Sequence, residues 1–115
     1  MPFDPGAARR WRGDIHHHIV LAQKFAEGMS YDALRDDLCV TYAVTRCLEI
    51  ISEASRRLPD EVKARHPSIP WRDMAAAGDI YRDEDVAVRG VWDTLHHRLP
   101  SLRIVIEQEL GLGDP

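Results

Sequence analysis

The amino-acid sequence predicts an all-α protein, a single-domain bundle of five to six helices. Apolar residues recur at intervals of three and four along most of the chain, which is the spacing of one face of an α-helix. No segment alternates apolar and polar residues for more than four positions, so the pattern does not predict strands. A length of 115 residues fits one domain with a modest core.

The composition is that of a globular protein, with 44% hydrophobic and 30% charged residues. The net charge of −4 gives no overall positive field, so contact with nucleic acid would need a local basic patch. No run of about 18 apolar residues predicts a membrane helix, and the N-terminus lacks an apolar signal core. Cys39 and Cys47 would lie about 12 Å apart on one helix, too far for a disulfide. We therefore expect reduced core thiols in a cytoplasmic protein.

The N-terminal residues 1–13 are rich in proline, glycine and arginine and are predicted to be flexible, with at most a short turn near 7–12. Their arginines around Trp11 could contact phosphate, but a solvated arm with Trp11 folded onto the body is the favoured interpretation. Asp14 is then expected to cap a first helix that runs to about Glu27 and stops at Gly28. The histidines at 16–18 point in different directions on such a helix, so they cannot bind one metal ion together.

A short and then a long helix are expected next. Ser30 is the predicted N-cap of a helix at 31–36, and the long helix covers about 37–58. The apolar residues of the long helix follow spacings of four and three, which predicts a central position in the bundle or a dimer interface. They are Val40, Val44, Cys47, Ile51, Ala54 and Leu58.

The opposite face of the long helix is polar and carries Arg46, Glu49, Glu53 and the arginines 56–57. These residues could form ordinary ion pairs on the helix surface. They could also form a polar stripe that faces the acidic segment 79–85. The residues alone leave both alternatives open.

The second half of the chain is punctuated by prolines. Pro59 is predicted at the first position of a short helix, and Pro70 and Trp71 start another helix with a run of small residues at 75–78. A further helix is expected from Val86. Pro100 is expected to break the chain and start the last helix at 101–110, followed by a tail at 112–115.

Residues 79–85 form an acidic segment between two of these helices. If the first helix continues to Arg82, then Asp79, Arg82 and Asp83 share one face, and Asp85 caps the next helix. The carboxylates of Asp79, Asp83 and Asp85 could hold Mg²⁺ or supply a general base. A solvated helix end is the interpretation that the residues alone favour. No other cofactor is expected, because the common phosphate-loop, zinc and nucleophile motifs are absent.

Four motifs together resemble the HepT-like family of small helical proteins over about residues 14–111. They are G-M-S-Y-x-x-L at Gly28–Leu34, R-x-L-E-I-I-x-E-A-x-x-x-L at Arg46–Leu58, H-P-x-I-P-W-R at His66–Arg72 and V-W-x-x-x-x-x-x-L-P at Val91–Pro100. The order of these motifs is specific, and the match covers nearly the whole chain.

The resemblance implies a helical homodimer that is the toxin of a toxin–antitoxin pair. The toxin is a ribonuclease, and its antitoxin partner is a small MNT-type nucleotidyltransferase. The family motif is an arginine, four to six residues, a histidine, one residue and a tyrosine. The partner transfers AMP to that tyrosine and so silences the toxin.

The chain departs from the motif at its chemical positions. The variant G-N-x-Y-R-H-x-Y matches at Gly78, Tyr81 and Arg82, but its asparagine, histidine and tyrosine fall on Asp79, Asp83 and Asp85. An exposed aspartate, with a pKa of about 3.9, is a weak base and no acid at neutral pH. Asp85 also cannot accept AMP as a tyrosine does. We therefore expect lost or altered catalysis.

The resemblance assigns roles to the remaining site residues. Arg82, supported by Arg72 and Arg46, would contact RNA phosphate, and the three aspartates would occupy the catalytic positions and could recruit Mg²⁺. The alternative is a catalytically inactive helical dimer that still binds a nucleotidyltransferase. A third interpretation is an acidic, cation-binding bundle without the family's function.

Overall fold

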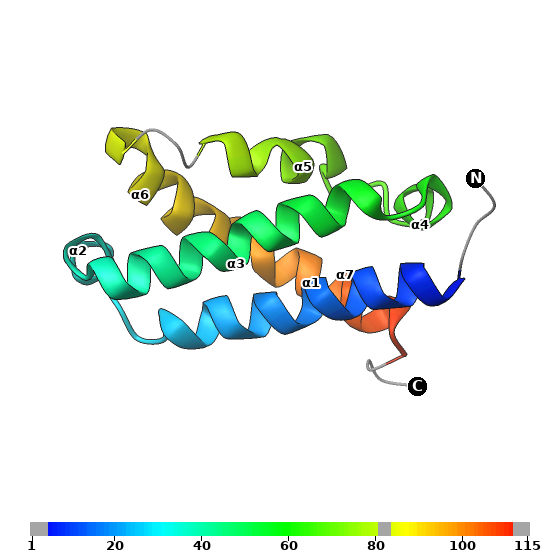
Figure 1. The fold of residues 1–115 in the computed structure, drawn as a ribbon, viewed down its shortest axis with the longest axis horizontal. Helices are drawn as coiled ribbons and strands as arrows, with labels where there is room; N and C mark the ends of the chain where they lie inside the picture. The colour runs from blue at the N-terminus through cyan, green and yellow to red at the C-terminus, as the bar shows by residue number, and fades with distance from the viewer. Residues whose placement is uncertain (1–4, 81–83, 112–115) are drawn as a thin grey trace.

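A computed structural model describes residues 5–80 and 84–111, and the side chains of residues 10–76 and 88–111 within them (Figure 1). This part of the chain contains helices and turns and no strand, which confirms the all-α prediction. The elements are α1 Pro5–Phe25, α2 Tyr31–Asp36, α3 Leu38–Arg57, α4 Asp60–Arg65, α5 Trp71–Ile80, α6 Glu84–Asp93, the π-helical turn η1 Thr94–Arg98 and α7 Leu99–Glu109.

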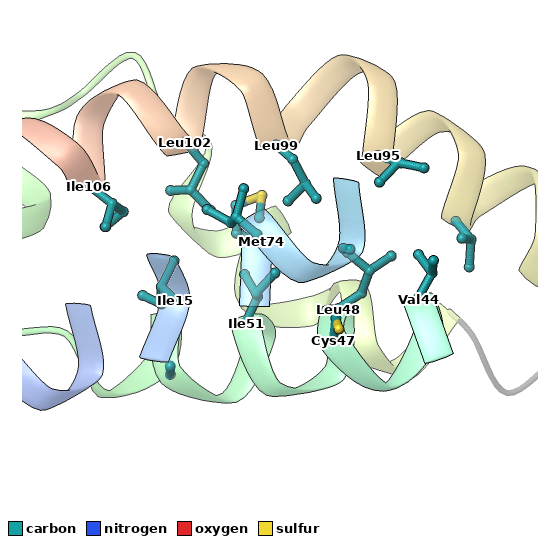
Figure 2. Close-up of a cluster of buried hydrophobic side chains, with 14 of the residues drawn as sticks. Ile15, Val44, Cys47, Leu48, Ile51, Met74, Leu95, Leu99, Leu102 and Ile106 are labelled. Carbon is teal, nitrogen blue, oxygen red and sulfur yellow. The ribbon is translucent and has the colours of Figure 1, made fainter. Parts of the chain in front are cut away.

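Helix α3 is the central element of the bundle. It lies between α1 and α5 and makes its most extensive contacts with these two helices (Figure 1). Its predicted apolar seam is confirmed, because Val44, Cys47 and Ile51 are all buried inside the single chain. Figure 2 shows Leu48 and Ile51 of α3 opposite Leu99 and Leu102 of α7 across the core. The seam is therefore used for packing within the chain.

The predicted helix starts around α2 and α3 are confirmed by their caps. The Ser30 hydroxyl accepts a hydrogen bond from the Ala33 N–H at 3.1 Å, and the Asp37 carboxylate accepts one from the Val40 N–H at 3.0 Å. The buried Thr41 hydroxyl lies 2.6 Å from the Leu34 carbonyl, which joins the two helices at their corner. These bonds satisfy backbone groups that helix ends leave without partners.

The expectation of a flexible segment at 1–13 is wrong for residues 5–13, and Asp14 does not cap the first helix. Helix α1 begins at Pro5, so Asp14 lies inside it. Proline suits a helix start, because its missing N–H would have no partner there. Trp11 is half-buried against the core, as the favoured interpretation of the sequence expected.

The predicted break at Pro100 is also wrong. Helix α6, the π-turn η1 and α7 follow one another without a gap, and Pro100 lies in the first turn of α7. The Leu99 N–H donates to the Thr94 carbonyl, five residues back, so the turn before the proline is widened. A widened turn leaves room for the proline ring. It also tolerates the loss of the backbone hydrogen bond that proline, without an N–H, cannot donate.

Three smaller expectations are corrected. Helix α6 begins at Glu84, so Asp85 lies in its first turn instead of capping it. Pro59 is the N-cap of α4 and not its first helical residue. Cys47 is buried as expected, but Cys39 is exposed at the start of α3.

Within the residues placed by the structure, no helix combines the length and apolar character needed to cross a membrane.

Candidate functional site

The acidic segment joins α5 to α6 at one end of the bundle (Figure 1). Asp79 lies in the last turn of α5 and Asp85 in the first turn of α6, but their side chains are outside the described part. Arg82 and Asp83 lie outside the described residues altogether. The convergence of Asp79, Arg82, Asp83 and Asp85, and their binding of Mg²⁺, therefore stay predictions.

The helix that leads into this segment is held by two side chains of α3. The Ser52 hydroxyl donates to the Ala75 carbonyl at 2.7 Å, and the Arg56 Nε–H donates to the same oxygen at 2.9 Å. Glu53 orients the arginine through an ion pair of 2.9 Å. A carbonyl four residues before Asp79 thus receives two hydrogen bonds from the central helix, which fixes the path of α5 toward the acidic segment.

The polar face of α3 lies mainly beside α1. Arg46, Glu49, Glu53 and Arg57 line a hollow of about 280 Å³ together with Trp11 and Asp14 of α1 and with Ile50 and Ala54. Glu53 pairs with Arg57 at 2.9 Å as well as with Arg56. The ion pairs expected on the helix surface are therefore present. Arg56 also reaches α5, through its hydrogen bond to the Ala75 carbonyl.

Arg46 and Arg72, two of the arginines assigned to RNA phosphate, lie in different parts of the surface. Arg46 lines the hollow beside α1, whereas Arg72 is exposed in the first turn of α5 and does not line it. Arg72 is also about 10 Å along the helix axis from Asp79, at a rise of about 1.5 Å per residue. The phosphate role of Arg46 and Arg72 stays a prediction.

Two histidines of α1, His16 and His18, have separate hydrogen-bond partners. His16 Nε2 lies 2.9 Å from a Glu107 carboxylate oxygen of α7, while His18 Nδ1 lies 2.7 Å from the Asp14 carbonyl of its own helix. Among the residues whose side chains are described, no three histidine, cysteine or acidic side chains are grouped as metal ligands. Of this run, His16 joins α1 to α7.

A buried carboxylate, Glu109, joins three elements at the other end of the bundle. Arg65 makes two hydrogen bonds to it, of 3.0 and 2.8 Å, and His66 Nε2 lies 2.7 Å from Oε1. Arg12 of α1 lies 3.9 Å from Oε2. The hydrogen bonds from Arg65, with those from His66, lower the pKa of Glu109 to about 2, against the opposing effect of burial. This cluster fixes the ends of α1, α4 and α7 together.

The motif that begins at His66 has a structural role at this end. The Trp71 indole N–H donates to the carbonyls of Lys63 and His66, at 3.1 and 3.0 Å. Ile69 is buried, and the His66 ring is bound to Glu109. The motif therefore builds the corner between α4 and α5 and holds it against α7.

A row of rings and one cation, which sequence reasoning missed, runs over α6, α2 and η1. The His96 ring lies 4.0 Å from the Trp92 ring, Trp92 meets Tyr31 edge to face at 5.8 Å, and the Arg89 guanidinium lies 5.1 Å from the Tyr31 ring. Tyr31 is 61 residues from Trp92, so no local pattern predicts the contact. The i, i+4 spacing of Trp92 and His96 was the available signal for one half of the row.

Known proteins match the chain over most of its length. A probable ribonuclease HepT of Thermococcus cleftensis is 39% identical over 78% of this chain and 84% of its own length. Two further relatives are named as RNases. One, from Methanocaldococcus jannaschii, is 30% identical over 83% of this chain and 80% of its own length. The other, from Caldanaerobacter subterraneus, is 33% identical over 73% of this chain and 77% of its own length.

The family comparison gives the same result. No solved structure matches the chain. The model of the family described as ribonuclease HepT-like matches residues 15–109, which run from the buried Ile15 of α1 to the Glu109 cluster of α7. The chain belongs to the ribonuclease HepT-like family.

Proposed function

We propose that this protein is the toxin-type member of a toxin–antitoxin pair, with its ribonuclease activity lost or altered. The observation that carries the proposal is a family match over 15–109 in a chain with aspartate at 79, 83 and 85. The hydrogen bonds from Ser52 and Arg56 support the proposal, because they hold α5 where it enters the acidic segment. At the positions where the family motif has the acid, the base and the AMP acceptor, this chain has aspartate.

The chemistry of the replaced positions supports altered catalysis. Attack by a 2′-OH needs a base and an acid that exchange protons near neutral pH, and histidine is suited to both roles. An exposed aspartate stays ionised and repels phosphate. Any residual cleavage would need a divalent cation at Asp79, Asp83 and Asp85 to offset that charge and to activate water.

RNA cleavage tests this proposal. The wild-type protein, incubated with RNA in EDTA, is expected to show no more cleavage than Asp83→Ala. Cleavage that appears with Mg²⁺ and is lost in Asp83→Ala identifies altered, metal-dependent catalysis, and no cleavage in either condition identifies lost catalysis. Cleavage in EDTA that Asp83→Ala abolishes would contradict the proposal.

The second candidate function is a catalytically inactive homodimer that binds an MNT-type nucleotidyltransferase. The retained corner at His66 and Trp71 and the capped helices favour it, because the packing features remain while the motif positions have changed. The exposed apolar side chains of Leu38 and Tyr42 on α3 support pairing of two copies. With free cysteines at 39 and 47, we place this complex in the cytoplasm.

Co-purification tests the second candidate. The protein and a nucleotidyltransferase encoded next to it are expected to elute as one complex, and the protein alone as a dimer. A protein that elutes as a monomer and does not bind the nucleotidyltransferase would overturn this candidate.

A further inference from the structure

A groove between α1 and α7 lies next to the row of rings. The row consists of Arg89, Tyr31, Trp92 and His96. The groove has a volume of about 500 Å³, and His96 belongs to both features, since it lines the groove and packs on Trp92. The other lining residues are Val20, Gln23, Lys24, Ala26, Glu27, Gly28, Leu95, Pro100 and Arg103. The rings and the groove thus meet at His96.

The groove is lined by two cationic side chains, Lys24 and Arg103. Lys24 forms no ion pair with any residue of the described part, and Arg103 is held by Gln23 at 2.7 Å and by Glu107 at 3.1 Å. The guanidinium has five N–H donors, so these two bonds leave others for a ligand. Glu27 is the acidic side chain among the lining residues. The cations lie on either side of the groove, one on α1 and one on α7.

The surface combines three neighbouring rings with cations at Arg89, Lys24 and Arg103, and this combination suits one class of ligand. Unpaired nucleobases stack on aromatic rings and arginine planes, while the phosphates of the same strand contact lysine and arginine. A duplex keeps its base faces stacked inside and would not use the rings. The acidic segment 79–85 repels phosphate, so affinity for RNA has to come from another surface.

We propose that His96, Trp92, Tyr31 and Arg89 form a stacking subsite for single-stranded RNA, with Lys24 and Arg103 contacting its phosphates. The proposal builds on RNA as the ligand class of the proposed function, but it requires no cleavage. His96 is the outer ring of the row: it is exposed, whereas Trp92 and Tyr31 are half-buried. A base added to the row would therefore stack first on the His96 ring.

The neighbouring histidine supplies a matched control. His97 is also exposed and lies in the same π-turn, but it lines a different hollow, with Ser68, Pro70 and Arg98. His96→Ala and His97→Ala thus remove the same side chain from adjacent positions, and both sites are on the surface. Thermal unfolding monitored by circular dichroism verifies that each variant folds.

Fluorescence anisotropy with a labelled single-stranded RNA of about 12 nucleotides, in EDTA, measures the binding. Because stacking of one base is worth about 1–3 kcal/mol, His96→Ala is expected to raise Kd about fivefold or more, with His97→Ala within about twofold of wild type. Lys24→Gln is expected to raise Kd and to make binding less sensitive to salt. The same RNA annealed to its complement is expected to bind more weakly.

Several results would overturn the subsite. They are no binding of the single strand, equal losses in His96→Ala and His97→Ala, or tighter binding of the duplex. A cleavage assay on the same preparations keeps the two proposals distinct. Cleavage in EDTA that Asp83→Ala abolishes would contradict the proposed function without affecting the subsite. Binding by His96→Ala that equals wild type would remove the subsite and leave the proposed function standing.

Discussion

Arg65 and Glu109, which are 44 residues apart in sequence, form a two-bond ion pair that joins α4 to the end of α7. The Glu109 side chain is 9% exposed and also binds His66. An acid at the C-terminal end of a helix is unfavourable in the field of the helix dipole, so its cationic partners determine whether it stays charged. This relationship makes the fold sensitive to acid.

The free energy of unfolding is predicted to fall as pH falls through the range that Glu109 titrates. The pKa of Glu109 is lowered from an ordinary value of 4.5 to about 2 in the folded protein. The ionised carboxylate therefore contributes its full stabilisation of the fold above about pH 4.5, and this stabilisation is lost as pH falls toward 2. Glu109→Gln is expected to cost on the order of 2 kcal/mol at pH 7. Urea unfolding over a pH series measures the difference.

The control for this prediction is Glu61→Gln. Glu61 also pairs with Arg65, at 3.3 Å, but its side chain is 72% exposed. Its removal is expected to cost less than about 0.5 kcal/mol, as for other surface pairs. A Glu109→Gln deficit that is the same at pH 7 and near pH 2 would disprove the role of the ionised carboxylate.

Ser52 and Arg56 are predicted to support each other, because both donate to the Ala75 carbonyl. Ser52→Ala or Arg56→Leu alone leaves this oxygen with one side-chain donor, so each should cost about 1 kcal/mol. The double variant should cost more than the sum of the two. Strictly additive losses in urea unfolding would show that the two bonds do not share one acceptor.

The indole N–H of Trp71 is predicted to stabilise the corner between α4 and α5. Trp71→Phe keeps an aromatic ring but removes the donor to the Lys63 and His66 carbonyls. The expected loss is about 1–2 kcal/mol, because hydrogen-bond partners in a partly buried corner are left unpaired. Denaturant unfolding provides the measurement, and unchanged stability would contradict this role.

The two thiols are predicted to differ in reactivity. Cys39 is exposed, whereas burial raises the pKa of the Cys47 thiol and shields it from reagents. A thiol-specific reagent at neutral pH should therefore modify one cysteine in the folded protein and both after unfolding. Cys39→Ser should abolish the fast reaction and Cys47→Ser should retain it. Fast modification of both thiols would contradict the buried position of Cys47.

Local rules were sufficient for much of the fold. The caps at Ser30 and Asp37 and the apolar seam of α3 follow from neighbouring residues and helix periodicity, so they could be predicted. The start of α1 at Pro5 could not, because Trp11 packing and the Arg12–Glu109 contact depend on residues distant in sequence. The uninterrupted passage through Pro100 needed a π-turn, which no local rule indicates.

The candidate site divides in the same way. The motif order predicted the family. The assignment of motif positions to Asp79, Asp83 and Asp85 stays a prediction. The support of α5 by Ser52 and Arg56 required knowledge of which face of α3 meets α5. Contacts between distant helices, such as Tyr31 with Trp92, are set by the packing of the whole bundle.

The cleavage of single-stranded RNA in EDTA tests the central claim most directly, with the wild-type protein compared with Asp83→Ala. We propose that, with aspartate at 79, 83 and 85, the protein does not cleave RNA without a metal ion. The predicted result is equal, background cleavage by both proteins. Cleavage by the wild type in EDTA that Asp83→Ala abolishes would contradict the claim.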